Sequence, residues 1–172
     1  MNSPLYFDCF DWKKLREEYL LGDAFLARYT KISRDELFAI QDARFKSCLQ
    51  RAWKIPFYQR LWGGKGIESG DIKGLADIIK LPTFSKTELM ESVELAPPLG
   101  DYHGLDSFDI AHRPPMVLHT TSGTTGRPQP LPFGPRGREI QNLLLGRAYT
   151  LQGIGGNDRI HSVYGHGLIN GG

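Results

Sequence analysis

A segment rich in glycine, threonine and serine in the second half of the chain has the composition of an anion-binding loop. Glycines let successive backbone N–H groups converge on one point, and small hydroxyl side chains add donors that can turn toward phosphate oxygens. An apolar run, Met116–Leu118, leads into this segment and predicts a buried strand. The composition predicts a polyphosphate site, because hydroxyl residues crowd around Gly123 and Gly126: Thr120, Thr121, Ser122, Thr124 and Thr125.

A plain surface turn has a similar composition and stays open as the alternative. The phosphate interpretation is favoured by the preceding strand and by Arg127 and Pro128, because proline fixes the direction in which the chain leaves. Commoner nucleotide motifs are excluded by spacing. A Walker loop would need glycine where Pro128 stands, and the dinucleotide pattern would need glycine at Asp158 or Asn170.

Four landmarks in a fixed order make the chain resemble a known family. Residues 121–128 are similar to the phosphate-binding loop of the adenylate-forming (AMP-binding) superfamily. Three further stretches narrow the resemblance to the phenylacetate–coenzyme A ligase branch: Ile55–Tyr58, Leu81–Leu89 and Val163–Gly172. The landmarks run from about the fifties to the end, so the sequence is identified as the N-terminal part of a phenylacetate–coenzyme A ligase-like member.

The resemblance implies an ATP-dependent acyl or aryl coenzyme A ligase. Such enzymes let a carboxylate attack the α-phosphorus of ATP, which releases pyrophosphate, and a thiol then displaces AMP. The implied cofactors are ATP, Mg²⁺ and coenzyme A, and the implied substrate is an aromatic acid such as phenylacetate. The residues that the resemblance places around the β and γ phosphates are Thr121, Ser122, Gly123, Thr124, Thr125 and Gly126. One preorganised donor can be worth about 3 kcal/mol in a dry site.

One position in this segment departs from the wider superfamily. Gln129 stands where many members have lysine, so a full positive charge is missing. The phenylacetate branch is similar in often lacking that lysine, which supports the narrower resemblance. Arg127 is an alternative source of charge, although a side chain just before Pro128 can equally point into water.

The last residues of the chain resemble the segment that lines the acyl pocket in this branch. The residues concerned are Tyr164, Gly165, His166 and Gly167. A tyrosine and an imidazole beside glycines can form a flat slot for an aromatic acid, with His166 orienting the carboxylate. A glycine-rich turn with two incidental rings stays open as the alternative. No catalytic residue and no metal ligand is predicted, because the resembled family's other motifs lie further downstream.

Bulk properties exclude several function classes. The 172 residues are 40% hydrophobic and carry a net charge of +2, with 21 cationic and 19 acidic side chains dispersed along the chain. No basic stripe indicates nucleic-acid binding, and no run approaches the roughly 18 apolar residues of a membrane span. Cys9 and Cys48 do not form a disulfide framework or a metal motif. We therefore expect a cytoplasmic protein without nucleic-acid or membrane partners.

The pattern predicts an α/β fold with a helix-rich region over 1–112 and the start of a nucleotide-binding α/β region over 113–172. Helices are expected over 12–29 with a break near Gly22, over 33–53 and 85–93 after capping boxes, and over 56–62 and 136–151. Strands are expected over 116–120, 129–133 and 159–163. Strand, loop, helix and strand in this order form the unit of a parallel, helix-covered sheet.

The chain stops within a loop, so we expect a fragment that is inactive alone, from a parent enzyme that continues beyond it. A sheet with its edges exposed predicts self-association. The competing hypothesis from another class is a noncatalytic, truncated helical interaction module that retains a phosphate-type loop. Among ligases, the acceptor could also be a protein thiol or hydroxyl, as in the acyl-protein synthetases of luminous bacteria.

Overall fold

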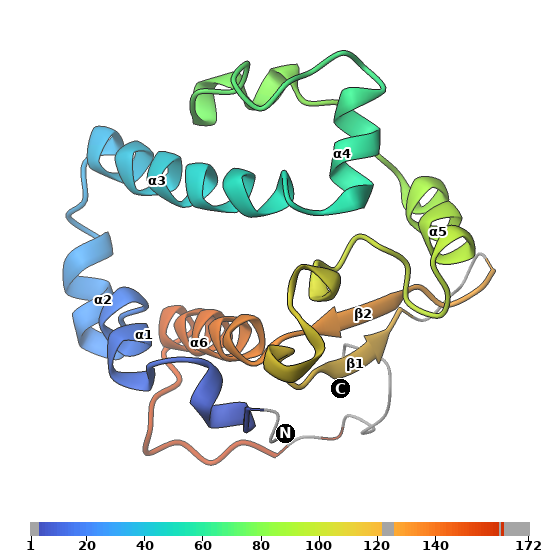
Figure 1. Cartoon of the computed structure of the whole chain (residues 1–172). Coiled ribbons are helices and arrows are strands. Elements are labelled where there is room, and N and C mark those ends of the chain that lie inside the picture. The colour runs from blue at the N-terminus through green and yellow to red at the C-terminus, as the bar shows by residue number, and fades with distance from the viewer. Residues whose placement is uncertain (1–3, 122–125, 162, 164–172) are drawn as a thin grey trace. The chain divides into compact units, whose positions relative to one another are not determined.

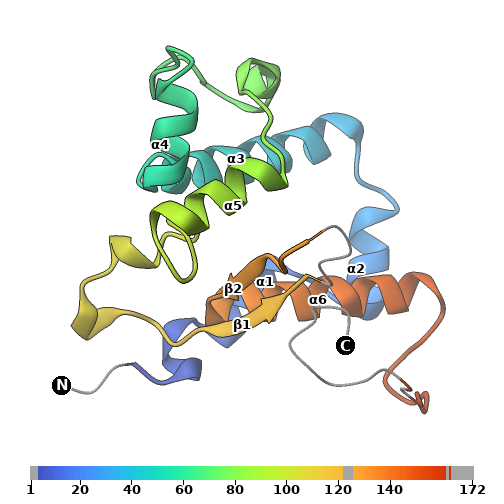
Figure 2. The ribbon, with the colours of Figure 1, turned by 90° about the vertical axis from the view of Figure 1, so that its right-hand side faces the viewer.

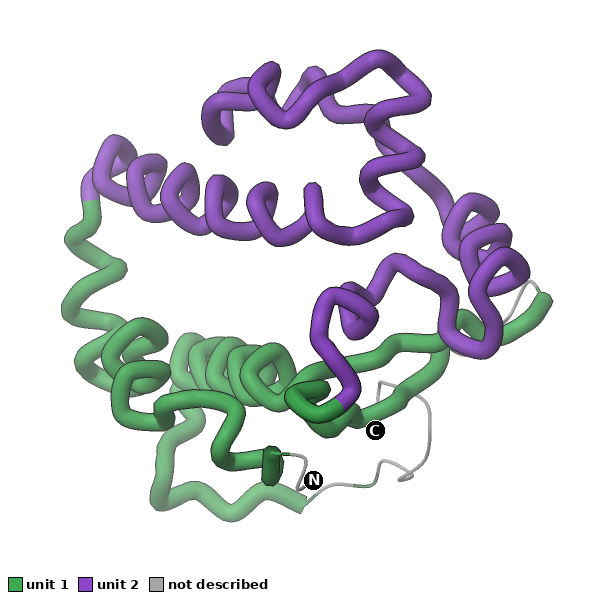
Figure 3. Tube along the Cα trace, in the orientation of Figure 1, with its two compact units in different colours: residues 1–32, 111–172 green, residues 33–110 purple. Residues whose placement is uncertain are grey.

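The computed structural model of the chain describes residues 4–121, 126–161 and 163 (Figure 1). It divides into two compact units, one formed by residues 1–32 with 111–172 and the other by residues 33–110 (Figure 3). The first 32 residues thus share a unit with the phosphate segment, whereas the sequence groups them with the other helices. A functional division between 112 and 113 stays a prediction.

The unit formed by residues 33–110 is helical in its described secondary structure. Its helices are α3 (Arg34–Ala52), α4 (Pro56–Gly63) and α5 (Lys86–Leu95), with 3₁₀ turns at Leu75–Lys80 and Leu105–Ser107. Both predicted capping boxes are confirmed. At the start of α3 the Ser33 hydroxyl accepts from the Glu36 N–H at 3.2 Å, and the Glu36 carboxylate accepts from the Ser33 N–H at 3.0 Å. Each cap satisfies N–H groups that have no partner within the helix.

A small apolar core holds this unit together. Leu49, Trp62 and Ile72 are buried in one cluster, with the Trp53 and Trp62 rings packed edge to face at 4.8 Å. The sequence favours Phe38, Phe45, Leu49 and Ala52 for the apolar face of α3. Phe45, Leu49 and Ala52 belong to this core, whereas Phe38 is 48% exposed.

A buried polar cluster ties the loop after α5 to α4. Arg60 donates two hydrogen bonds to the Asp101 carboxylate, one of them at 2.9 Å. The Ser92 hydroxyl donates to the same carboxylate at 2.6 Å and accepts the Asp101 N–H at 2.9 Å. The hydrogen bonds from Arg60, which have the largest effect, hold the pKa of Asp101 below its usual range. Burial of the carboxyl acts in the opposite direction and raises this pKa, and the Ser92 hydrogen bond lowers it further. Pro97–Pro98, between Ser92 and Asp101, is a cis peptide bond.

The other unit joins two distant parts of the chain. Its elements are a 3₁₀ turn at Tyr6–Cys9, α1 (Trp12–Glu18), α2 (Gly22–Tyr29), β1 (Val117–Thr120), β2 (Pro130–Phe133) and α6 (Pro135–Leu151). The predicted break near Gly22 is confirmed, and Figures 1 and 2 both show α1 and α2 alongside α6. Leu15 of α1 and Tyr19, the residue that caps α1, are buried against Leu143 of α6, which explains why the N-terminal residues belong here.

Arg147 of α6 connects these helices through a hydrogen bond and cation–π contacts. Its side chain is buried, and its Nε donates to the Leu20 carbonyl at 2.9 Å. Its guanidinium lies over three aromatic rings, at 5.5 Å from Tyr19, 4.9 Å from Phe25 and 5.0 Å from Tyr29. A cation held against ring faces gains electrostatic stabilisation, so this arginine fixes α1 and α2 against α6.

The two strands form an antiparallel pair, so the predicted parallel sheet is absent from the described residues. Val117 pairs with Phe133 and Thr120 with Pro130. The connection between the strands is shorter than the roughly twelve residues that a parallel crossover needs, and a hairpin results. The expected fold class is nevertheless confirmed, since helices precede the first strands of a small sheet.

Two details of the expected α/β unit are wrong. The described residues of 159–163 form no strand, and Ile160 and Val163 are exposed. A strand exists only where its backbone pairs with another, and weak alternation in sequence does not supply that partner. In α6 the sequence favours Leu143, Leu144, Ala148 and Leu151 for the buried face; Leu143 is buried, but Leu144 and Leu151 are 47% and 68% exposed.

The Asp101 cluster gives a pH-dependent prediction. Because the pKa of Asp101 is lower when folded, its contribution to stability is full above the unfolded value of about 3.9 and is lost as pH falls through the folded value. We expect Asp101→Asn to lower the free energy of unfolding by about 1–2 kcal/mol at neutral pH, discounted because Arg60 is partly exposed. Urea unfolding should show this difference shrinking below about pH 4.

An exposed carboxylate on α5, Glu94, provides the control. Glu94→Gln should leave the free energy of unfolding within about 0.5 kcal/mol of wild type at neutral pH. The free energies of unfolding of wild type and Asp101→Asn are compared from neutral pH to about pH 3. A difference between them that stays constant over this range would contradict the proposed origin of this stability.

Candidate functional site

The hairpin closes the phosphate segment at its base. The Thr121 N–H donates to the Gln129 carbonyl at 3.1 Å, and the Gln129 N–H donates to the Thr121 hydroxyl oxygen at 3.1 Å. This reciprocal pair continues the β1–β2 ladder by one step beyond Thr120 and Pro130. The chain between Thr121 and Gln129 is thereby held with its two ends together, as a compact anion-binding loop requires.

Two of the six predicted phosphate-binding residues, Thr121 and Gly126, lie in the described part of the chain. Thr121 uses its backbone N–H within the hairpin, so its hydroxyl proton is the donor that it can offer a ligand. Gly126 has φ of 140°, a conformation that side chains disfavour, while a Cβ there would meet nothing within 4 Å. The backbone rather than the available space therefore calls for glycine at 126.

The remaining predicted residues lie outside the described ones. They are Ser122, Gly123, Thr124 and Thr125 of the phosphate segment, and Tyr164, Gly165, His166 and Gly167 of the acyl segment. Their roles stay predictions. Arg127 is exposed and Gln129 is half-buried.

His119 is a residue of this site that the sequence left unassigned. It lies in β1, two residues before Thr121, and is 9% exposed. Its ring packs edge to face on Phe133 of β2, with the ring centroids 5.7 Å apart. Within the described part of the chain, neither ring nitrogen has a hydrogen-bond partner. A buried polar group without a partner costs about 1–3 kcal/mol, so a histidine in this environment lowers the stability of the folded chain.

A metal site or a membrane-spanning helix would be recognisable in the described ranges 4–121, 126–161 and 163. There, no group of three or more His, Cys, Asp or Glu side chains could hold a metal ion. None of the helices in those ranges is both long enough and apolar enough to cross a bilayer.

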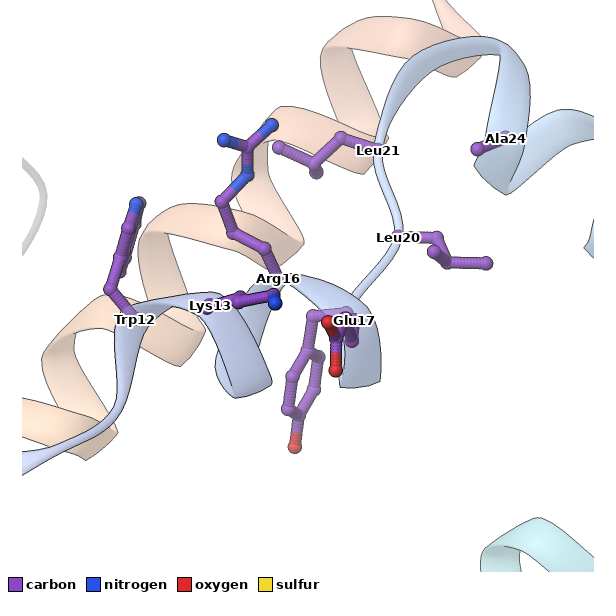
Figure 4. A pocket seen from close by; sticks show the side chains of 8 residues that line it. Trp12, Lys13, Arg16, Glu17, Leu20, Leu21 and Ala24 are labelled. Atoms are coloured by element: carbon purple, nitrogen blue, oxygen red, sulfur yellow. The ribbon is translucent and has the colours of Figure 1, made fainter.

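A separate hollow of about 450 Å³ lies at the corner between α1 and α2. Figure 4 shows Trp12 and Arg16 pointing to one side of α1, with Leu21 beside them and Glu17 directed elsewhere. The lining residues are Trp12, Lys13, Arg16, Glu17, Tyr19, Leu20, Leu21 and Ala24. None of them is a predicted site residue, and the hairpin is therefore the better candidate for the functional site.

Curated relatives of the chain are named phenylacetate–coenzyme A ligases. The protein from Escherichia coli (strain K12) is 33% identical over 143 residues, which cover 81% of this chain and 30% of the relative. The protein from Aromatoleum evansii is 30% identical over 143 residues, covering 83% of this chain and 30% of the relative. The chain thus spans under a third of the length of these relatives. No model of a known protein family matches it.

The solved structures that the chain resembles are also coenzyme A ligases. A 2-hydroxyisobutyryl-CoA ligase in the postadenylation state, in complex with 2-HIB-AMP, matches with a TM-score of 0.60 at 28% identity. The match covers 72% of this chain and 25% of that protein. An open conformation of the same ligase, in complex with 2-HIB-AMP and CoA, matches with a TM-score of 0.52 at 30% identity, over 64% of this chain and 23% of that protein.

The hairpin closure gives a prediction at Thr121. Thr121→Val keeps the side-chain shape but removes the oxygen that accepts the Gln129 N–H. Loss of a hydrogen bond worth about 1 kcal/mol should speed hydrogen exchange at the Gln129 amide by roughly five- to tenfold. Exchange measured by NMR checks this.

Thr121→Ser retains the hydroxyl and should leave exchange at the Gln129 amide near the wild-type rate. Equal exchange rates in the valine variant and the wild type would show that the Thr121 hydroxyl does not close the hairpin.

Proposed function

We propose a function that follows from the family of this chain. The chain belongs to the phenylacetate–coenzyme A ligase-like group of the adenylate-forming superfamily, and it corresponds to the N-terminal part of those ligases. The proposal is that it supplies the polyphosphate-binding hairpin of an ATP-dependent ligase. That ligase adenylates a carboxylic acid and transfers the acyl group to coenzyme A. The closed hairpin base at Thr121 and Gln129, directly flanking the Gly- and Thr-rich segment, is the observation that carries the proposal.

The first step places a clear demand on this segment. A carboxylate oxygen forms a bond to the α-phosphorus of ATP, the bond from that phosphorus to the bridging oxygen breaks, and pyrophosphate leaves. Negative charge moves onto the departing pyrophosphate, and donors fixed in advance stabilise it without reorganising. The donors proposed here are the hydroxyls and backbone N–H groups of residues 121–126, with the Thr121 hydroxyl among them.

The hairpin fits a polyphosphate through its donors rather than through a lysine. Gln129 uses its backbone N–H to close the loop, and its side chain carries no charge. Arg127 is exposed in the same segment and can supply a positive charge to the phosphates. Magnesium, when bound with the nucleotide, supplies further positive charge on the phosphate oxygens.

The acid that we propose as substrate is aromatic and phenylacetate-like. Support comes from the names of the curated relatives and from the residues Tyr164, Gly165, His166 and Gly167, which suit a flat ring and a carboxylate. The solved neighbours act on 2-hydroxyisobutyrate, a small aliphatic acid, so acid specificity varies among related ligases. We propose a cytoplasmic location and self-association of the isolated chain through exposed apolar side chains such as Leu144 and Leu151.

The test is pyrophosphate release by the whole protein that carries this sequence, with ATP, magnesium and a panel of aryl and aliphatic acids. Pyrophosphate release should require an aryl acid, and repeated turnover should also require coenzyme A. The double variant Gly123→Val, Thr124→Val should reduce release by about 100-fold or more, because preorganised donors are lost. Gly156→Val is the control, since a Cβ at Gly156 meets nothing within 4 Å.

The two competing outcomes are distinct. Release that requires an aliphatic rather than an aryl acid would keep the ligase and correct the substrate. Absence of release with every acid, from protein shown to be folded, would contradict the ligase and favour a noncatalytic interaction module.

A further inference from the structure

The hollow at the corner between α1 and α2 combines an aromatic side chain with two cations. Trp12 is 45% exposed, and the exposed side chains of Lys13 and Arg16 line the hollow with it. Figure 4 shows Trp12 and Arg16 projecting on the same side of α1, with Leu21 beside them. With a volume of about 450 Å³, the hollow falls in the size range of sites that take a ligand or a few side chains of a partner.

The positive charge in this hollow is not neutralised by the described part of the chain. Neither Lys13 nor Arg16 has an ion pair or a side-chain hydrogen bond with another described residue. The neighbouring carboxylate of Glu18 is already engaged, because it pairs with Arg136 at 2.9 Å. Glu17 also lines the hollow, but Figure 4 shows its carboxylate directed away from the side on which Arg16 projects. The hollow therefore presents positive charge to a ligand that enters from the Arg16 side.

Exposed aromatic rings extend this surface toward the N-terminus. The ring centroids of Phe7 and Phe10 lie 6.2 Å apart, and those of Phe10 and Trp12 lie 6.1 Å apart, so the three rings form a continuous strip. Phe7, at the far end of the strip, is 75% exposed. Contiguous exposed apolar side chains mark interaction surfaces, and aromatic residues and arginine are enriched at the centres of protein interfaces. The composition is therefore that of a protein-binding surface.

Two other occupants fit this surface less well. A second copy in a two-fold contact would bring the same cations to both sides, and like charges that face each other oppose association. An anionic bilayer is recognised by clusters of about four to eight lysine or arginine side chains. Here two cations line a hollow that also carries Glu17, and a concave site suits an inserted side chain better than a flat lipid surface.

We propose that this surface docks an acidic segment of a partner protein, with a large apolar side chain of that segment beside Trp12 and its carboxylates on Lys13 and Arg16. The carboxylates gain charge-assisted hydrogen bonds, and the apolar side chain leaves water for the face of the indole ring. The inference goes beyond the proposed ligase function and does not depend on it, because none of these residues belongs to the hairpin.

The experiment measures binding of a short fluorescein-labelled peptide, built of alternating pairs of glutamate and leucine, to the full chain by fluorescence anisotropy at physiological salt. We expect saturable binding with a Kd below about 100 μM, as for a transient interface. Arg16→Glu and Trp12→Ala should each weaken this binding by about tenfold or more. Peptides with lysine in place of glutamate, or with alanine in place of leucine, should also bind about tenfold more weakly.

Lys14→Glu is the matched control, since it makes the same kind of charge reversal on the same helix outside the hollow. It should change the peptide affinity by less than about threefold, because salt screens exposed charges that do not touch the ligand. Thermal unfolding shows whether each variant is folded. Arg16→Glu alters an exposed side chain, so it decides the question even where Trp12→Ala fails to fold.

Several results would overturn the inference. Equal peptide affinity in wild type, Arg16→Glu and Trp12→Ala would place the peptide elsewhere, and equal affinity for the lysine peptide would remove the charge argument. No peptide binding by the wild-type chain overturns the docking site, and binding to phosphatidylserine vesicles in its stead assigns the surface to a membrane. Binding by this chain but not by the whole protein that carries it would show that the rest of that protein covers the surface.

The outcome is separable from the proposed function. Arg16→Glu and Trp12→Ala should leave pyrophosphate release by the whole protein unchanged, because neither residue belongs to the phosphate or acyl segment. Loss of release in these variants, with the protein folded, would contradict a separate docking surface. Absence of release in the wild type would contradict the ligase and leave the docking surface to be decided by the peptide measurements.

Discussion

The reciprocal hydrogen bonds between Thr121 and Gln129 are the constraint on which the candidate site depends. They bring the two ends of the phosphate segment together, and they extend an antiparallel ladder that fixes which side chains of β1 share a face. His119 precedes that closure by two residues in β1, and among the described residues its buried ring nitrogens have no hydrogen-bond partner. Gly126, within the closed segment, adopts a backbone angle suited to glycine. A polyphosphate loop needs preorganised donors, and preorganisation begins with a closed base.

The rest of this unit supports the hairpin through α6, which begins directly after β2. Residues near the N-terminus pack on this helix: Tyr6 donates to the Glu139 carboxylate at 2.8 Å, and Leu15 and Tyr19 bury Leu143. Burial and the hydrogen bond to Glu139 raise the pKa of Tyr6 to about 12, so the phenol stays a donor at any ordinary pH. Chain segments more than a hundred residues apart thus form one small core.

Local chemistry in the sequence predicted the helices well and the sheet poorly. The capping boxes at Ser33 and Ser85 and the break near Gly22 depend on neighbouring residues alone, and they are confirmed. Strand pairing depends on distant partners, which is why the antiparallel pairing was not predicted and why the described residues of 159–163 do not form the expected strand. His119 could not be identified from sequence, because its interest comes from burial without a partner; a polar residue at an inward position of an apolar strand was the only signal.

NMR titration of the chain with MgATP, following backbone amide shifts, shows directly whether the hairpin binds phosphate. We expect saturable shifts centred on the hairpin, at Thr120, Thr121, Gly126 and Gln129, with no comparable shifts around Asp101. Saturable shifts around Asp101 or along the α1–α2 hollow, with the hairpin amides unmoved, would contradict the claim that the hairpin is the phosphate site.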